Sequence, residues 1–582
     1  MLKILKRLKS REWLMILVIL VFIVLQVWLT LRVPRYMQEI TLIVTTPGGV
    51  LRDVWVQGGM MLLATLGVVA TQVVGSYLSA KLAASVSYRL RRDVFTRVES
   101  FSMEEINGFS TASLITRTTN DVTAVQQFIV MGINVIVQAP IMAVWAVSRM
   151  SAMDMSWTIL TGGMAAAIVI MIASLFMYVL PKFRRIQELT DNVNRVTREN
   201  LSGIRVVRAY NAEKFQEAKF EEVNDNFTAN NLSVFRAFQI MNPIMRMIMM
   251  GLGIGIFWIG AFLIDAAAPY ARHEIFANMV VFQQYATQVI MSFMMLTMVF
   301  MMMPRVVVSI KRVNEVLETQ PTITDGTVTV SPEGVLGEVE FKNVSFKYPD
   351  AEEYVLHNIS FKAHKGETVA FIGSTGSGKS TLINLVPRFY DATEGQVLID
   401  GVDVKEYTQE ALRDKLGYVP QRAVMFTGSV SLNVAFGRDE ELDRIKKAVE
   451  IAQGQEFVEK MHDTYDALIS QGGTNVSGGQ RQRLAIARAV YRQPEIYIFD
   501  DSFSALDYRT DRALRSALKR ETHGTTNLIV AQRIGTIRDA DRIVVLDEGK
   551  VVGIGTHDEL MVSCEVYQEI AYSQLSKEEL GA

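Results

Sequence analysis

A glycine-rich loop with one lysine and several hydroxyl side chains follows a short apolar strand. The strand is expected over residues 368–372, Thr-Val-Ala-Phe-Ile, and a helical stretch follows the loop. Glycines let backbone N–H groups curl around an anion, and the helix N-terminus adds a favourable partial charge. This strand–loop–helix context predicts a nucleotide-phosphate site. It comprises Gly373, Ser374, Thr375, Gly376, Ser377, Gly378, Lys379, Ser380 and Thr381.

Two side chains of the loop and one distant acid are expected to act on a bound Mg²⁺–nucleotide. Lys379 should reach the outer phosphates, and Ser380 should ligate Mg²⁺. Asp500 follows the apolar strand Ile496–Phe499 and is expected to hold Mg²⁺ directly or through water. An Asp after four apolar residues means little alone, so its weight comes from the loop upstream.

A second motif, Val476-Ser-Gly-Gly-Gln-Arg-Gln-Arg483, precedes a mostly apolar helix over residues 484–490. It resembles the ABC transporter signature, usually Leu-Ser-Gly-Gly-Gln, which other phosphate-loop NTPases lack. The resemblance implies that Ser477, Gly478, Gly479 and Gln480 contact the ATP of a partner domain. Val at position 476 is a mild departure.

The remaining motifs of the family occur in the expected order. Tyr348 falls where an aromatic ring stacks on adenine. Gln421 falls at the glutamine that senses Mg²⁺ and the membrane domain. Residues Ser504-Ala-Leu-Asp507 match the loop that crosses between paired nucleotide domains. The resemblance therefore implies ATP and Mg²⁺ as cofactors, with Ser380, Gln421 and Asp500 around the metal.

Two positions depart from the family pattern. Asp501 stands where the water-activating base is usually Glu, and Gln532 stands where a His is expected. Shortening the base withdraws its carboxylate by one methylene, and a misplacement of about 1 Å can cost ~100-fold in rate. Gln cannot take up a proton as His does. Gln471, beside the signature, also stands where related exporters often have Glu. Each change alone could be drift, but the pair predicts a degenerate ATP site.

An intact signature in a chain with a degenerate ATP site predicts that the two ATP sites of a paired transporter have different roles. The chain resembles the degenerate-site subunit of heterodimeric bacterial multidrug ABC exporters. Two nucleotide domains of this family pair head to tail, so this chain would complete its partner's site. The expected partner is a second half-transporter with the usual Glu and His.

Six uncharged apolar runs occupy the first 303 residues, and none follows. They cover Trp13–Leu31, Val54–Ala80, Val122–Ser148, Met155–Leu180, Met247–Ile264 and Ile275–Met303. Each approaches or exceeds the ~20 residues of a membrane helix. The fold class expected is an all-α polytopic membrane domain fused to an α/β P-loop ATPase domain, since strands and helices alternate after residue 338.

Basic residues cluster before the first run, between the second and third, and between the fourth and fifth. The positive-inside rule then places both termini and the ATPase domain in the cytoplasm, as in a multi-pass protein of the bacterial inner membrane. A signal peptide is the alternative for the N-terminus, but no clear cleavage site follows Leu31. Residues 1–11 are expected to lie as a surface helix. Cys564 is the single cysteine, so no internal disulfide forms.

The loops between runs two and three and between runs four and five are long, charged and helical in periodicity. We expect helices that continue well beyond the bilayer. Residues 113–122 and 203–210 resemble the two intracellular loops of bacterial multidrug exporters, and short coupling helices there are implied to dock on nucleotide domains. The expected domains are 1–310 (membrane), 311–337 (linker), 338–575 (ATPase) and 576–582 (tail).

The cargo is less constrained than the energy source. The net charge of −2 gives no signal for nucleic acid. No acid lies mid-span, so ATP rather than a proton relay should drive transport. Thirty methionines suit apolar packing or binding of amphiphiles equally well. Polar residues within spans are cavity candidates, namely Asn134, Gln138, Gln283, Gln284, Gln288 and Arg246, although Arg246 could sit at the cytoplasmic boundary.

The leading hypothesis is efflux of hydrophobic or amphiphilic small molecules. Lipid or peptide cargo stays open, although no peptidase domain precedes the spans. The alternative class is a regulatory, ATP-sensing ABC protein, which usually carries extra segments.

Overall fold

The computed structural model describes residues 8–46, 48–330, 336–349 and 351–574, and its chain divides into two compact units. The first unit runs to Glu99 and resumes over Ala112–Thr319. The second combines the short segment Ser100–Thr111 with the chain from Gln320 onward. The tail at 576–582 and most of the expected N-terminal surface helix lie outside the described residues.

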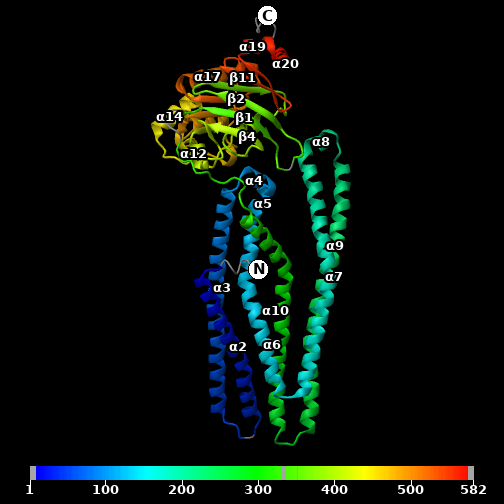
Figure 1. Ribbon diagram of the computed structural model, residues 1–582. Helices are drawn as coiled ribbons and strands as arrows, with labels where there is room; N and C mark the ends of the chain where they lie inside the picture. The colour runs from blue at the N-terminus through cyan, green and yellow to red at the C-terminus, as the bar shows by residue number, and fades with distance from the viewer. Residues whose placement is uncertain (1–7, 47, 331–335, 350, 575–582) are drawn as a thin grey trace. The chain divides into compact units, whose positions relative to one another are not determined.

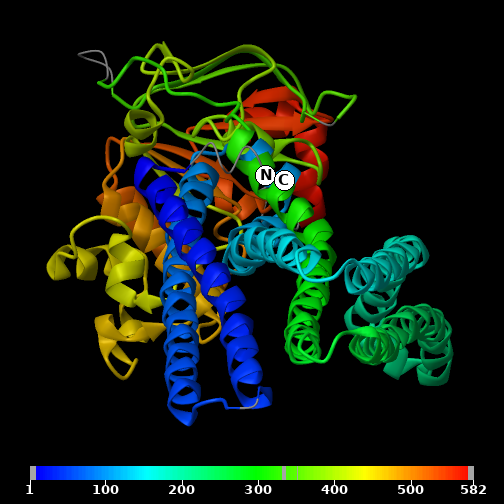
Figure 2. The ribbon, with the colours of Figure 1, turned by 90° about the horizontal axis from the view of Figure 1, so that it is seen from below.

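The first unit consists of long helices (Figures 1 and 2). Six helical segments among the described residues are long and apolar enough to cross a membrane, which confirms the six expected spans. The helices are α2 (Ser10–Thr45), α3 (Leu51–Glu99), α6 (Val122–Ser151), α7 (Met155–Ser202), α9 (Glu213–Ala266) and α10 (Arg272–Glu318).

The helices extend far beyond their apolar windows, as the periodicity of the charged loops predicts. The longest, α9, has 54 residues and would measure about 80 Å. The short helix α8 (Ile204–Ala209) joins α7 to α9, and α5 (Thr111–Thr116) with a π-helical turn (Arg117–Asp121) leads into α6. Helix α10 continues to Glu318, so residues 311–318 of the expected linker are helical.

The helices of the first unit pack mainly as neighbours in pairs: α2 with α3, α6 with α10, and α7 with α9. A buried ion pair joins the first pair, because Glu12 accepts hydrogen bonds from Arg89 at 2.5 Å and from Ser85 at 3.0 Å. At the π-helical turn, Ser309 of α10 donates to the buried Asp121 at 2.7 Å. Such buried polar contacts fix which helix faces meet.

The second unit is built on two larger sheets. A four-stranded antiparallel sheet has the order β2-β1-β4-β5, and a six-stranded sheet has the order β12-β11-β3-β10-β9-β6. Five neighbouring strands of the larger sheet are parallel, and β12 is antiparallel to β11. The strands are β1 (Val339–Phe346), β2 (Leu356–Ala363), β3 (Thr368–Gly373), β4 (Glu394–Ile399), β5 (Val402–Asp403), β6 (Leu416–Val419), β9 (Ile496–Asp500), β10 (Thr526–Val530), β11 (Arg542–Asp547) and β12 (Lys550–Gly555).

Helices and a two-stranded ribbon complete this unit. The ribbon pairs β7 (Gly428–Ser429) with β8 (Leu468–Ile469). The helices are α4 (Met103–Phe109), α11 (Lys379–Asn384), α12 (Gln409–Asp414), α13 (Val430–Ala435), α14 (Leu442–Ile451), α15 (Gln455–Glu459), α16 (Gly478–Arg492), α17 (Tyr508–Glu521), α18 (Ile534–Ile537), α19 (His557–Ser563) and α20 (Glu565–Gln574). The expected α/β domain is therefore present.

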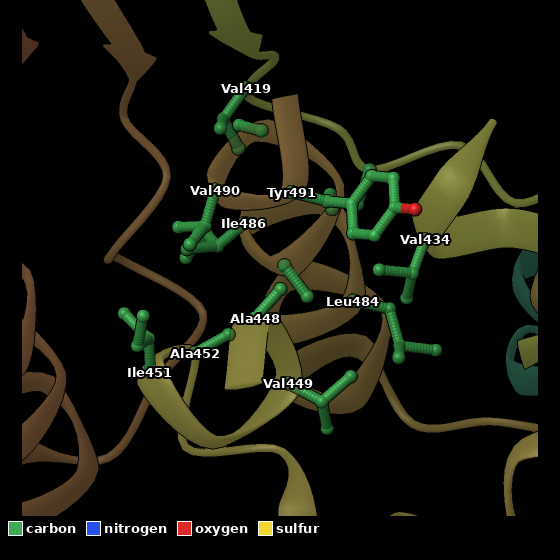
Figure 3. Close-up of a cluster of buried hydrophobic side chains, with 14 of the residues drawn as sticks. Val419, Val434, Ala448, Val449, Ile451, Ala452, Leu484, Ile486, Val490 and Tyr491 are labelled. Carbon is green, nitrogen blue, oxygen red and sulfur yellow. The ribbon is translucent and has the colours of Figure 1, made fainter. Parts of the chain in front are cut away.

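A buried apolar cluster ties the helical part of this unit to the sheet. Figure 3 shows Leu484, Ile486 and Val490 of α16 gathered with side chains of α13 and α14 and with Val419 at the end of β6. The apolar face of α16 is thereby held against the rest of the unit. Its N-terminus, where the signature residues lie, is consequently fixed in position.

Candidate nucleotide-binding site

The glycine-rich loop occupies the turn between β3 and α11, as its sequence predicts. At Gly373 a Cβ atom would lie 2.0 Å from the backbone oxygen of Leu546, so no other residue fits beside β11. Gly378 has φ +91°, a left-handed conformation that side chains disfavour. Both glycines are therefore required by the backbone path, and the N-terminus of α11 opens onto the loop.

The lysine of the loop is folded into it. Lys379 Nζ donates to the backbone oxygens of Gly373 at 2.9 Å and Ser374 at 2.7 Å, and to Ser377 Oγ at 3.2 Å. Burial lowers the pKa of Lys379, although the nearby carboxylates of Asp501 and Asp500 oppose this effect. A partly desolvated ammonium at this loop is suited to bind an anion such as a phosphate.

The acid at the end of β9 reaches the first turn of α11. Ser380 Oγ donates to Asp500 Oδ1 at 2.9 Å. Burial raises the pKa of Asp500, and the Asp501 charge adds to this, while the Ser380 hydrogen bond and Lys379 lower it. Five parallel strands end at one sheet edge, so residues 120 positions apart in sequence meet here.

The hydroxyl–carboxylate pair fits Mg²⁺, which prefers hard oxygen ligands. Among the described residues, no group of three or more His, Cys, Asp or Glu side chains is arranged to hold a metal ion. Ser380 and Asp500 would therefore hold Mg²⁺ together with water and oxygens of the nucleotide, which is the usual arrangement for this ion. The side-chain amide of Gln421 donates to Asp501 and does not point at this pair.

The second acid, Asp501, is bonded by two glutamines. Its Oδ2 accepts from Gln532 Nε2 at 2.8 Å and from Gln421 Nε2 at 3.2 Å. Its side chain is buried, and its backbone has a left-handed φ of +45°. Two amide donors therefore already occupy one oxygen of this carboxylate.

Most of these groups line one cavity of about 500 Å³, a size suited to a small-molecule ligand, whereas Ser377 and Asp500 are not among its lining residues. Its walls include the loop residues Gly373–Gly376 and Gly378–Thr381, and Gln421, Asp501 and Gln532. Tyr348 is not among the lining residues. Its ring packs edge-on against Tyr390 with centroids 5.3 Å apart, and its hydroxyl lies 3.0 Å from Thr381 Oγ1.

The signature residues lie apart from this cavity and form the first turn of α16. Ser477 is the N-cap: its Oγ accepts from the Gln480 N–H at 3.2 Å, and the Gln480 side chain accepts from the Ser477 N–H at 2.8 Å. None of Ser477, Gly478, Gly479 and Gln480 lines the cavity. The structure therefore does not bring the signature to the phosphate loop of the same chain.

The loop after Asp501 joins the base position to α17. Ser504 Oγ donates to the Asp501 backbone oxygen at 2.9 Å. Asp507 caps α17 by accepting from the Thr510 N–H at 3.0 Å. Both residues predicted for the inter-domain loop thus have local structural partners as well.

Sequence reasoning missed Gln574, at the last turn of α20. Its Nε2 donates to the Gln532 backbone oxygen at 2.7 Å, and its Oε1 accepts from the Ile534 N–H at 2.9 Å. It also lines the cavity with Ile570 and Ser573. A single Gln at a helix end carries no recognisable signal, so only the structure reveals that it holds the segment around Gln532.

The short helix α4 packs within the second unit. Its capping box joins Ser102 and Glu105, and Glu105 Oε1 also accepts from the Thr322 N–H at 2.9 Å. Burial alone would raise the pKa of Glu105, but these hydrogen bonds outweigh burial and lower it. Asn107 Nδ2 donates to the Tyr390 hydroxyl at 2.9 Å. Helix α4 therefore contacts the aromatic cluster that contains Tyr348.

Two family profiles cover most of the chain. The ABC transporter transmembrane region matches residues 15–293, and the ABC transporter family model matches residues 356–504. The chain belongs to the ABC transporter family. It is a multi-pass ABC exporter with an ATPase domain whose hydrolysis of ATP is coupled to transport.

Relatives of this ABC exporter align over most of their own length. An uncharacterised ABC transporter ATP-binding protein of Mycobacterium bovis is 37% identical over 89% of this chain and 88% of that protein. An ATP-dependent lipid A-core flippase of Chromohalobacter salexigens is 30% identical, covering 89% and 90%. A putative multidrug export protein of Bacillus subtilis is 30% identical, covering 83% of each.

The fold also matches a solved structure. A bacterial Atm1-family ABC exporter with ATP bound superposes with a TM-score of 0.80 over 98% of this chain and 100% of that one, at 24% identity. The expected half-transporter architecture is thereby confirmed.

Proposed function

We propose that this ABC exporter is one half of a heterodimer that moves amphiphilic small molecules outward. Its own ATP site is degenerate, and its signature completes the catalytic site of the partner. The observation that carries this proposal is the Asp501 carboxylate, which accepts amide hydrogen bonds from Gln532 and Gln421 and has no histidine beside it.

The residues of the site would have separate roles in holding Mg²⁺–ATP. The loop 373–381 would hold the phosphates through its N–H groups and Lys379, and Ser380 with Asp500 would hold Mg²⁺. Bound Mg²⁺ would neutralise charge on the phosphates. Gln421 would sense the metal from the loop after β6. Tyr348 would stack on adenine once its ring leaves its edge-on contact with Tyr390.

The side chains around Asp501 would make it a poor general base. A general base must lie within hydrogen-bond reach of the attacking water and be free to accept its proton. Asp501 is one methylene shorter than Glu, and two amides already occupy one of its oxygens. Gln532 can donate and accept hydrogen bonds but cannot carry a proton. The site would therefore bind ATP well and turn it over slowly.

The signature supports pairing with another chain. Ser477, Gly478, Gly479 and Gln480 are intact and do not line the cavity of their own chain. A partner with Glu and His at the matching positions would gain a competent site from them. The inter-domain loop, Ser504 and Asp507, would transmit the state of one site to the other.

Placement in the cell follows from charge. Basic residues concentrate at the N-terminus and in the two long loops, which favours a cytoplasmic location for both termini and the ATPase domain. Helix α4 belongs to the first of these loops and packs within the ATPase unit. This packing supports a location of that loop and the ATPase domain on the same side of the membrane. The membrane is then the bacterial plasma membrane.

Amphiphilic cargo is supported by the Bacillus subtilis relative, which is a putative multidrug export protein. A lipid cargo is the second candidate, because the Chromohalobacter salexigens relative is a lipid A-core flippase. Both classes combine an apolar body with a polar head, and both suit a membrane domain rich in Met.

The direct test is efflux of an amphiphilic dye from cells. Cells expressing this chain alone should retain the dye, and cells that also express a partner half-transporter with Glu and His at the matching positions should expel it. The lysine-to-alanine change in the partner's phosphate loop is the control and should abolish efflux. Full efflux by this chain alone would contradict the heterodimer.

A further inference from the structure

An apolar groove lies between α2 and α6 of the membrane domain. Its volume is about 480 Å³, within the range of small-ligand sites. The lining side chains are all apolar: five aliphatic residues of α2 between Leu17 and Leu25, together with Trp28 and Trp145. The polar residues expected to line a cavity, including Asn134 and Arg246, are not part of it.

The length of the groove matches one leaflet of a bilayer. Leu17 and Trp28 are eleven residues apart on α2, which corresponds to about 16 Å along the helix axis. The hydrocarbon core of a bilayer is about 30 Å thick, so the groove is about as deep as one leaflet. An extended acyl chain is the natural occupant of a trough with these walls and this length.

Two arginines mark one end of the groove. Arg32 follows Trp28 by one helical turn, and its guanidinium carbon lies 4.9 Å from the Trp28 ring centroid. Arg149 follows Trp145 by the same four residues on α6, so it shares the face of that tryptophan. Each groove tryptophan is therefore followed, one turn later, by a cation.

Both arginines lie at the same end of the groove. Helices α2 and α6 are in contact, and the chain returns between them once, along α3. They consequently run in the same direction (Figure 1), and the groove brings Trp28 together with Trp145. Among the described residues, no carboxylate pairs with Arg32 or Arg149, whereas Arg35 has Glu39 at 3.7 Å.

We propose that the α2–α6 groove binds a membrane lipid with an anionic head. Its acyl chain lies along Leu17–Trp28, and its phosphate lies between the guanidinium groups of Arg32 and Arg149. Guanidinium groups bind phosphate oxygens through paired N–H donors, and the stem of each arginine covers an aromatic ring. A cationic amphiphile meets repulsion at the same end. Lipid binding here depends on neither the degenerate ATP site nor the heterodimer.

Bromine atoms on an acyl chain quench nearby tryptophan fluorescence, and two of the six tryptophans line the groove. The purified full chain is titrated in detergent with brominated phosphatidylglycerol and, separately, with brominated phosphatidylcholine of the same chains. We expect saturable quenching at lower concentrations of the anionic lipid. Trp28→Phe combined with Trp145→Phe should remove the difference between the two lipids.

The arginine variants test the head-group contact. Arg32→Gln and Arg149→Gln should each weaken binding of the anionic lipid by roughly five-fold, and the double variant should bind both lipids equally. Arg272→Gln, at the start of α10, removes the same charge away from the groove and should change nothing. Inorganic phosphate at millimolar concentration should not displace the lipid, because it lacks the acyl chain.

Three results would overturn the proposal. Equal quenching of the unmodified protein by both lipids would mean that the groove takes any acyl chain. Identical quenching of the unmodified chain and the double tryptophan variant would mean that protein, not lipid, covers the groove. Displacement by inorganic phosphate would mean that the arginines bind a free anion. The first comparison needs no variant, so a misfolded variant cannot hide the answer.

Discussion

At the scale of single residues, the Asp501 carboxylate accepts hydrogen bonds from both Gln532 and Gln421. The phosphate loop, Asp500 and the adjacent Asp501 and Gln532 were all identifiable from type and spacing. The contact between Asp501 and both glutamines was not, because a hydrogen bond between residues 80 positions apart depends on strand order. Gln574 could not be identified from the sequence for the same reason. Tyr348 is not among the residues that line the cavity, and its ring packs edge-on against Tyr390.

The two substitutions at the degenerate site should act together. Asp501→Glu alone should raise ATP hydrolysis by the purified chain very little, since Gln532 still occupies the histidine position. Asp501→Glu combined with Gln532→His should raise it at least ~10-fold, because proton transfer by a placed base is worth that and more. Steady-state phosphate release measures both, with Gln532→His as the matched control. A large gain from Asp501→Glu alone would show that Gln532 is harmless.

Nucleotide binding should weaken at mildly acidic pH, and more strongly when Mg²⁺ is present. Burial raises the pKa of Asp500, so this carboxyl takes up a proton at a higher pH than a free Asp, and Mg²⁺ requires its charged form. Because the folded-state pKa exceeds the unfolded one, ionised Asp500 costs stability at neutral pH, and the cost is relieved as the pH falls through the folded pKa.

A fluorescent ATP analogue, titrated between about pH 7 and pH 5, measures this effect. With Mg²⁺ the affinity should fall on acidification, and with EDTA it should fall less. Asp500→Asn should abolish the difference between the two series. Parallel slopes in the unmodified protein would mean that Asp500 does not contact the metal.

At the scale of elements, hydropathy located the six membrane helices, and periodicity predicted their long extensions. The residues at which the helices end were harder to predict. Helix α10 runs eight residues into the expected linker, since residues 311–318 carry no glycine or proline and their apolar side chains, Val313, Val316 and Leu317, are buried. The packing of α4 against Tyr390 depends on tertiary contacts that no local pattern encodes.

Helix α20 should restrain the segment that carries Gln532. Gln574→Ala removes both hydrogen bonds to this segment, each worth about 0.5–1.5 kcal/mol. Amide hydrogen exchange at Ile534 should therefore accelerate by roughly three- to ten-fold. Mass spectrometry of the peptide spanning 530–537 measures this exchange.

Glu569→Ala is the matched control, because Glu569 is an exposed residue of the same helix. It should leave the exchange of Ile534 unchanged. Equal acceleration by both variants would point to general loosening of α20, and no acceleration by Gln574→Ala would remove the proposed restraint.

At the scale of the whole molecule, the order of a membrane domain and an ATPase domain follows from where the apolar runs stop. The family and its exporter architecture were predictable because the signature is specific. The cargo was not, because apolar side chains distinguish ligands by shape and by a few charges. Arg32 and Arg149 became informative only when the structure placed them at the end of one groove.

The central claim is that this chain hydrolyses ATP slowly on its own and completes a faster site in a partner. Steady-state ATP hydrolysis by the purified chain, compared with the purified pair under the same conditions, tests it most directly. The degenerate site predicts a rate at least ~10-fold lower for the chain alone. Equal rates for the chain and the pair would contradict the division of labour.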